Sequence, residues 1–281
     1  MKPEVVPFVS LNMQILGREF ITMSMFKRML ASAGIGAAKV DLILHQDFVN
    51  AGDTISGTVQ IQGGRVDQEV DDVYAFVKTR YLKELNDKKM EVEATISKFL
   101  LASKFKVDAE QVYEFPVSFQ LPAITPVTLG RSPVWIQTGL DIKEAIDPKD
   151  QDYLQVGPHP YYAIILDAMN QLGFRIREVN CEYSPRYGRI NGLDFVQEFE
   201  FVPLSQFRNQ LDELEIIFFP NEDGIELLLQ IDRKARGLAG LFADALDTDE
   251  SFVKIRFDHN QLAYGVDYVA DQLLATIHKY V

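Results

Sequence analysis

From Lys39 onward, short runs of alternating apolar and polar residues recur between turn residues. The stretch Ile55–Ile61 alternates in this way, and Gly63-Gly64 closes it. A period of two is typical of a strand that buries one face and exposes the other. Because many such strands follow one another with few helices between them, the sequence predicts β-sandwich architecture and a mainly β fold.

The length of 281 residues fits two domains of ordinary size. The polar, proline-containing stretch Asp147–Asp152 predicts a linker, which places the domain boundary near residue 150. We expect a first sandwich over residues 25–150 and a second one, with added helices, over 151–281. Helices are predicted at Pro160–Leu172, Leu238–Leu246 and Tyr264–Lys279 because apolar residues recur there at helical spacing.

The net charge of −13 argues against a nucleic-acid partner, which requires clustered lysine and arginine. No apolar stretch is long enough to predict insertion into a membrane. Cys181 is the only cysteine, so neither an intramolecular disulfide nor a cysteine-based zinc site can form. Lys27-Arg28 is followed by too short an apolar run for a signal peptide. These features together predict a cytoplasmic protein.

Recognisable catalytic and cofactor motifs are missing or defective. The four histidines have no metal-binding spacing, and neither a Walker A loop nor a G-x-S-x-G elbow occurs. Gly34–Lys39 precedes a strand, whereas a dinucleotide fingerprint follows one. Asp247, Asp249 and Ser251 begin a calcium-loop spacing that lacks the required glycine and final glutamate. We therefore predict no catalytic, cofactor-binding or metal-binding residues.

Three sets of residues are candidates for other roles. Glu198 and Glu200 should share one face of a strand whose phenylalanines cover the other, so they could form a hydrolase site or simply a solvated face. Two further sets are hypotheses: a charged cluster that lies either between the domains or in a surface salt-bridge network, and a partner-docking helix. They comprise Asp232, Arg233 and Arg236 in the cluster, and Phe26, Met29 and Leu30 in the helix.

Several motifs in fixed order resemble the bacterial sporulation-control proteins, which act at stage zero of sporulation. The motifs are MFKRMLASAGIGAAKVD from Met25, LGFRIREVNCEY at Leu172–Tyr183, FVQEFEFVP at Phe195–Pro203, LDELEIIF at Leu211–Phe218 and DRKARGLAGLF at Asp232–Phe242. The resemblance covers residues 23–262. Residues 1–24 have no counterpart, and we predict a poorly ordered extension or an artefact of an upstream start site.

The resemblance implies two tandem arrestin-like β-sandwich domains with a few short helices. It also implies a non-enzymatic scaffold or regulatory protein that acts through protein–protein interaction, with no cofactor. The identity of the partner does not follow from the sequence, and exposed sheet edges make a homodimer a second expectation. The alternative function is a carbohydrate- or metal-binding β-sandwich module, motivated by the acidic loops and Trp135.

Overall fold

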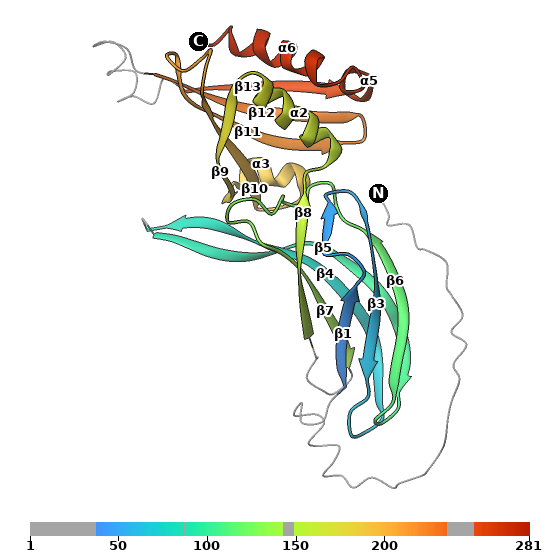
Figure 1. Ribbon diagram of the computed structural model, residues 1–281. Coiled ribbons are helices and arrows are strands. Elements are labelled where there is room, and N and C mark those ends of the chain that lie inside the picture. Colours follow the sequence, from blue (N-terminus) through green and yellow to red (C-terminus); the bar gives the residue numbers. More distant parts are fainter. Residues whose placement is uncertain (1–37, 87, 143–148, 235–249) are drawn as a thin grey trace.

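The computed structural model describes residues 38–86, 88–142, 149–234 and 250–281 (Figure 1). Several sequence-based predictions lie outside these residues. They are the extension 1–24, the docking helix with Phe26, Met29 and Leu30, the helix at 238–246, Arg236, and the acidic pair Asp247 and Asp249.

The protein is mainly β, which confirms the predicted fold class, and its first half consists of two facing layers. Its strands are β1 (Lys39–Leu44), β2 (Phe48–Asn50), β3 (Thr54–Gln62), β4 (Gln68–Leu85), β5 (Lys88–Val107), β6 (Val112–Gln120), β7 (Val134–Ile142) and β8 (Lys149–Gly157). One layer is β1-β3-β6, and the other runs β5-β4-β7-β8-β2. Their inner faces enclose a shared apolar core that includes Leu42, Ile55, Val73 and Leu140.

The alternation in the sequence produces this core directly. In β3, Ile55, Val59 and Ile61 are all completely buried, and polar neighbours lie on the other face. Burying an aliphatic side chain of this size contributes about 1.5–3 kcal/mol. A register slip of one residue would expose the whole apolar set, so the pattern specifies the pairing as well as the fold class.

The second half contains one five-stranded antiparallel sheet in its described residues, with the order β9-β10-β11-β12-β13. Its elements are α2 (Pro160–Gln171), β9 (Phe174–Tyr183), α3 (Pro185–Gly188), η1 (Arg189–Asn191), β10 (Phe195–Pro203), β11 (Leu211–Asn221), β12 (Gly224–Arg233), β13 (Glu250–Asp258), α5 (His259–Ala263) and α6 (Val266–Ile277). Alternation in the sequence predicts strands at Phe174–Tyr183, Phe195–Val202, Leu211–Phe219, Ile225–Ile231 and Ser251–Phe257, and the structure has one strand at each of these places.

Helices α2 and α6 pack side by side on one face of this sheet (Figure 1). Ile165 of α2 and Leu273 of α6 join Phe199 and Leu229 in a second apolar core. In the described residues these helices cover the sheet on the side where a sandwich would have a second sheet. They do so because both carry an apolar stripe at helical spacing. The predicted terminal helix is divided into α5 and α6 at Gly265, which has a φ of +86°.

The boundary between the halves differs from the predicted linker. Lys149–Gly157 forms β8, which pairs with β7 from Val134↔Leu154 to Gly139↔Lys149. The linker prediction is therefore wrong for Lys149–Asp152, and the strands of the first half extend beyond residue 150. Polar residues are accommodated there because β8 lies near the edge of its sheet, where only the three-residue β2 follows it.

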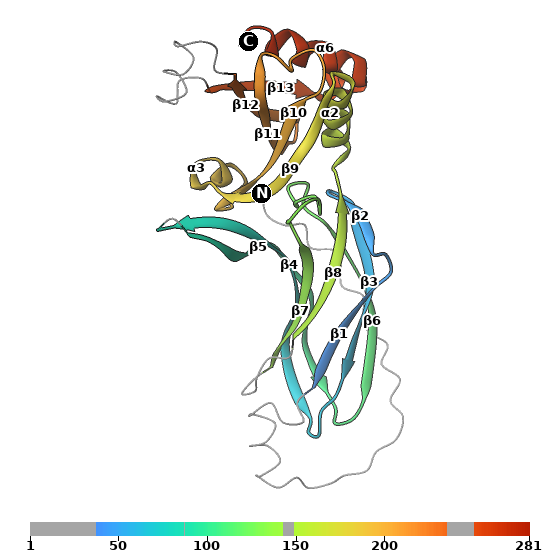
Figure 2. The same ribbon diagram turned by 60° about the vertical axis from the view of Figure 1, so that its left-hand side comes forward.

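Strands β4 and β5 form a long hairpin that leaves the sandwich. Its pairing continues from Gln68↔Val107 to Leu85↔Lys88. Figures 1 and 2 both show its tip projecting beside the second half, below β9 and α3. Near this tip β4 pairs in parallel with β9 at Leu82↔Glu182, so a single ten-stranded sheet connects the two halves.

Candidate functional site

An aromatic stack holds the two halves together beside the β4–β9 pair. The Tyr81 ring of β4 lies parallel to the Phe195 ring of β10, with 5.2 Å between centroids, and stacks on Tyr183 of β9 at 6.2 Å. Tyr81, Phe195 and Cys181 are buried and form a small cluster separate from the two main cores. Contacts of this kind between aromatic rings contribute about 0.5–1.5 kcal/mol beyond the burial of their area.

The loop between β6 and β7 supplies the polar part of this junction. Val127 N–H donates to Gln197 Oε1, and Gln197 Nε2 donates to the Val127 carbonyl oxygen, both at 2.8 Å. The Cys181 thiol donates to Ser132 Oγ at 3.4 Å, and burial raises the pKa of this thiol to about 12. Because a thiol with such a pKa is protonated at neutral pH, Cys181 is a packing residue here and not a nucleophile.

Replacing Gln197 with methionine should lower the free energy of unfolding by about 2 kcal/mol, because the Val127 N–H loses its acceptor and the Val127 carbonyl oxygen keeps only the bond from the Leu129 N–H. Urea titration followed by circular dichroism measures the change. Gln151→Met, at an exposed position of β8, is the matched control and should change stability by less than about 0.5 kcal/mol. Equal effects of the two variants would show that the amide bridge contributes nothing.

The face of the second sheet opposite α2 and α6 is rich in carboxylates, and we call it the open face. It carries Glu178, Asn180 and Glu182 from β9, Val196, Glu198 and Glu200 from β10, Glu213, Glu215, Ile217 and Phe219 from β11, Glu226 and Leu228 from β12, and Phe252, Lys254 and Arg256 from β13. Val196, Ile217, Phe219 and Leu228 form a small buried cluster with Tyr187 of α3 packed against it, whereas Phe252 is exposed.

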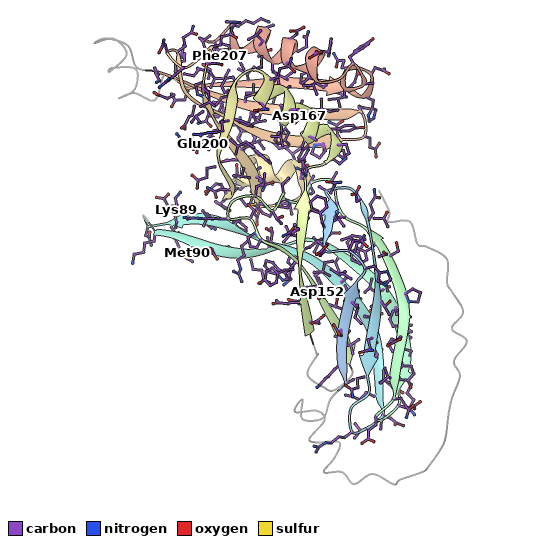
Figure 3. All side chains as sticks on the ribbon, viewed as in Figure 1. Lys89, Met90, Asp152, Asp167, Glu200 and Phe207 are labelled. Atoms are coloured by element: carbon purple, nitrogen blue, oxygen red, sulfur yellow. The ribbon has the colours of Figure 1, made fainter. Side chains whose placement is uncertain are left out.

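Glu198 lies in the centre of the open face. Burial, and then the charges of Glu215 and Glu182, raise its pKa to about 7, while the ammonium group of Lys89 opposes this shift. Lys89 belongs to the β4–β5 hairpin, so the first half contributes to the electrostatics of the second (Figure 3). Directly across the strand pair, Asn180 has a buried Oδ1 with no hydrogen-bond partner.

Glu200 differs from Glu198 although both share one face, as the sequence predicted. Its carboxylate forms an ion pair with Arg177, which also pairs with Glu213. Phe199 and Phe201 lie on the opposite face in the apolar core. A carboxylate held by an arginine is a poor general base, and neither carboxylate lines the cavity at the junction or the groove beside α2. The arrangement therefore gives no support to a hydrolase site.

Asp232 and Arg233 lie together near the end of β12. Their register partners in β11 are Glu213 and Leu211, whereas the junction contacts come from β4, β9, the start of β10 and the loop before β7. The structure therefore does not bring Asp232 and Arg233 to the contacts between the halves. Neighbouring antiparallel strands run in opposite directions, so the sequence does not tell which end of a strand lies at the junction.

A carboxylate cluster that the sequence analysis missed lies between the two layers of the first half. Asp41 of β1 and Asp150 and Asp152 of β8 come close together, and the Leu42 N–H donates to Asp150 Oδ2 at 3.1 Å. Burial and the neighbouring carboxyl groups raise the pKa of Asp152 to about 7. More than 100 residues separate β1 from β8 in the sequence, so these carboxylates come together only when the two strands pack in the folded protein.

The structure bears on the alternative binding functions as well. In the described residues, no group of three or more histidine, cysteine, aspartate or glutamate side chains is arranged to hold a metal ion. The Trp135 side chain is only 1% exposed, so its ring has no free face on which a sugar could stack. None of the helices in the described part of the chain has the length and apolar character needed to cross a membrane.

The protein is mainly β, and its described residues show no recognised catalytic arrangement. Its most prominent surface features are charged. The family model of the SpoOM protein matches residues 26–235. The chain belongs to this family of sporulation-control proteins, which confirms the resemblance found in the sequence.

Two comparisons give the extent of the similarity. The chain is 42% identical over 241 residues to the sporulation-control protein spo0M of Bacillus subtilis (strain 168), a match that covers 85% of this chain and 93% of that protein. The crystal structure of Spo0M, also from Bacillus subtilis, superposes with a TM-score of 0.77 at 38% identity. That match covers 88% of this chain and all of the solved one.

Proposed function

We propose that this protein is a non-enzymatic, arrestin-like regulatory scaffold of the sporulation-control family, which acts in the cytoplasm by binding other proteins. One observation carries the proposal. The β4–β5 hairpin projects from the sandwich, and Leu85 and Met90 near its tip are 55% and 49% exposed. Apolar side chains that do not pack within their own fold are typical of surfaces for protein partners.

The surroundings of the hairpin support the same function. Its tip lies near the open face, where Lys89 influences the carboxylates of Glu182 and Glu198. Two exposed apolar side chains at the tip, beside a charged sheet, give a partner both contact area and electrostatic selectivity. The parallel pairing of β4 with β9 fixes the hairpin relative to this sheet, so the two features form one surface.

The proposal can be tested by site-specific photo-crosslinking in the native cell. A photoreactive phenylalanine analogue at Met90 should give a crosslinked protein partner, identified by mass spectrometry. The same analogue at Val112 of β6, which is 56% exposed and far from the hairpin tip, is the matched control. Crosslinks from neither position, or the same crosslinks from both, would contradict a specific scaffold surface at the hairpin.

Among the described strands, β5 and β13 each pair on one side only, which also allows the homodimer that the sequence analysis expected, because an unpaired strand edge can pair with another chain. Sedimentation velocity of the purified protein distinguishes a dimer from a monomer. The carbohydrate- or metal-binding function has no observation in its favour beyond the acidic residues, and calorimetric titration with calcium, zinc or glycans should give no heat of binding.

A further inference from the structure

Strand β9 has a free edge beside helix α2. Its residues Phe174–Glu178 pair with β10 on one side, whereas β4 joins β9 only at Glu182, near the other end of the strand. In the described residues no strand occupies the remaining side of Phe174–Glu178. Backbone donors and acceptors on such an edge can pair with an added strand.

A groove of about 360 Å³ lies between this edge and α2. Phe174, Ile176 and Phe201 form its apolar part, and Asp167 and Asn170 of α2 and Arg175 of β9 form its polar rim. Asp167 and Arg175 are both exposed, and neither forms an ion pair within the described residues. Figure 3 shows Asp167 on the α2 side of the second half. The groove therefore has an apolar interior and an acidic residue on its α2 side, and the strand that bounds it carries the basic Arg175.

We propose that this groove binds an extended segment of a partner protein, which adds a short strand to β9 and inserts one large aliphatic side chain beside Ile176. The proposal rests on the scaffold function above and names a binding site within it. Successive side chains of an added strand point to opposite faces of the sheet. Because Ile176 faces α2 and Arg175 faces the open side, an aliphatic residue next to an acidic one matches this edge.

The charges select against other occupants. A glutamate opposite Arg175 forms a favourable cross-strand pair, and a lysine two residues from the aliphatic side chain points toward Asp167. A second copy of β9 would instead place Arg175 and Arg177 near their own equivalents, where like charges repel. The bulge at Arg177, between the pairs Glu200↔Glu178 and Phe201↔Ile176, also limits pairing to a short segment. The occupant is thus a short strand from a different protein.

Titration of the isotope-labelled full chain with a synthetic peptide tests this proposal by NMR. The probe is a capped heptapeptide with lysine, leucine and glutamate at its second, fourth and fifth positions and threonine elsewhere. We expect the amide signals of Arg175, Ile176 and Asn170 to shift most. Serine in place of leucine should weaken binding about tenfold or more, because the buried aliphatic contact is lost.

Variants of the protein separate the contributions. Arg175→Glu should weaken binding of this peptide about threefold to fivefold, and a peptide with lysine in place of glutamate should restore it. Asn170→Trp, at an exposed position on α2, should block the groove, while Gln272→Trp on α6 is the matched control. An unchanged amide spectrum confirms that each variant is folded.

Two outcomes would overturn the groove without affecting the scaffold function. One is the absence of shifts at Arg175, Ile176 and Asn170 with millimolar peptide, and the other is equal binding of the leucine and serine peptides. If a partner crosslinked at Met90 still binds the Asn170→Trp variant, the groove is not its binding site. The proposed hairpin surface is unaffected by that result. If the analogue at Met90 gives no crosslink while the peptide still binds, the hairpin surface is contradicted and the groove is not.

Discussion

Replacing Phe195 with alanine should lower the free energy of unfolding by about 3–5 kcal/mol, the usual cost of removing a buried aromatic side chain. Phe195 is 3% exposed and stacks on Tyr81 across the two halves, and it also lines a cavity of about 30 Å³ at the junction. Its removal therefore enlarges an existing void instead of allowing the surrounding side chains to close over it.

The same substitution should divide thermal unfolding into two transitions. The two main cores do not share residues, and Phe195 belongs to the small cluster between them. Without this contact the halves are expected to unfold separately, which differential scanning calorimetry detects as two heat-absorption peaks. Ile190→Ala, at a position that is 56% exposed, is the control and should leave one peak within about 0.5 kcal/mol of the original stability. A single, unshifted peak for the Phe195 variant would show that the junction does not couple the halves.

Replacing Glu198 with glutamine should raise the free energy of unfolding by about 2–3 kcal/mol at pH 8 and change it little at pH 4. The pKa of Glu198 is raised from 4.5 to about 7, so the folded protein binds the proton more tightly than the unfolded chain does. Its contribution to stability is fully present below pH 4.5 and is lost as the pH rises through 7. Glutamine carries no charge at either pH and avoids this loss.

The neighbouring Asn180 also favours an uncharged group at position 198. The protonated Glu198 carboxyl group, or a glutamine amide, has a hydrogen to offer to the unpartnered Asn180 Oδ1, which a carboxylate does not. Urea titrations at several pH values measure the difference in unfolding free energy between the variant and the original protein. The titration of Asp152 cancels in this difference because both proteins contain it. Glu178→Gln, exposed on the same face, is the control. A pH-independent difference would contradict the burial of the Glu198 charge.

The strands and the apolar cores could be predicted from the sequence because alternation determines which side chains enter the interior. The five strands of the second half and helix α2 followed from such patterns. Strand β8 did not, because Asp150, Gln151 and Asp152 resemble a polar linker until their sheet partner β7 is known. Local composition does not reveal that an edge strand can have polar residues on both faces.

The surfaces proposed for binding depended more on tertiary structure than on motifs. The shared face of Glu198 and Glu200 was predictable from their spacing, but the burial of Glu198 and the pairing of Glu200 with Arg177 were not. The groove beside α2 requires that β9 be an edge over half of its length, a property set by how far β4 extends along it. Long-range pairing of this kind leaves no periodic signal in the sequence.

The single parallel contact between β4 and β9 has a consequence for how the protein is made. Leu82 is synthesised roughly 100 residues before Glu182, its partner in the sheet. At about 5–20 residues per second, the ribosome reaches that partner only about 5–20 s later. The strands of the first sandwich are all synthesised once the chain has reached Gly157, so this sandwich can fold before Glu182 is made, while β4 is paired with β5 near the hairpin tip but still lacks β9. Joining of the two halves is therefore one of the last steps in the biogenesis of this protein.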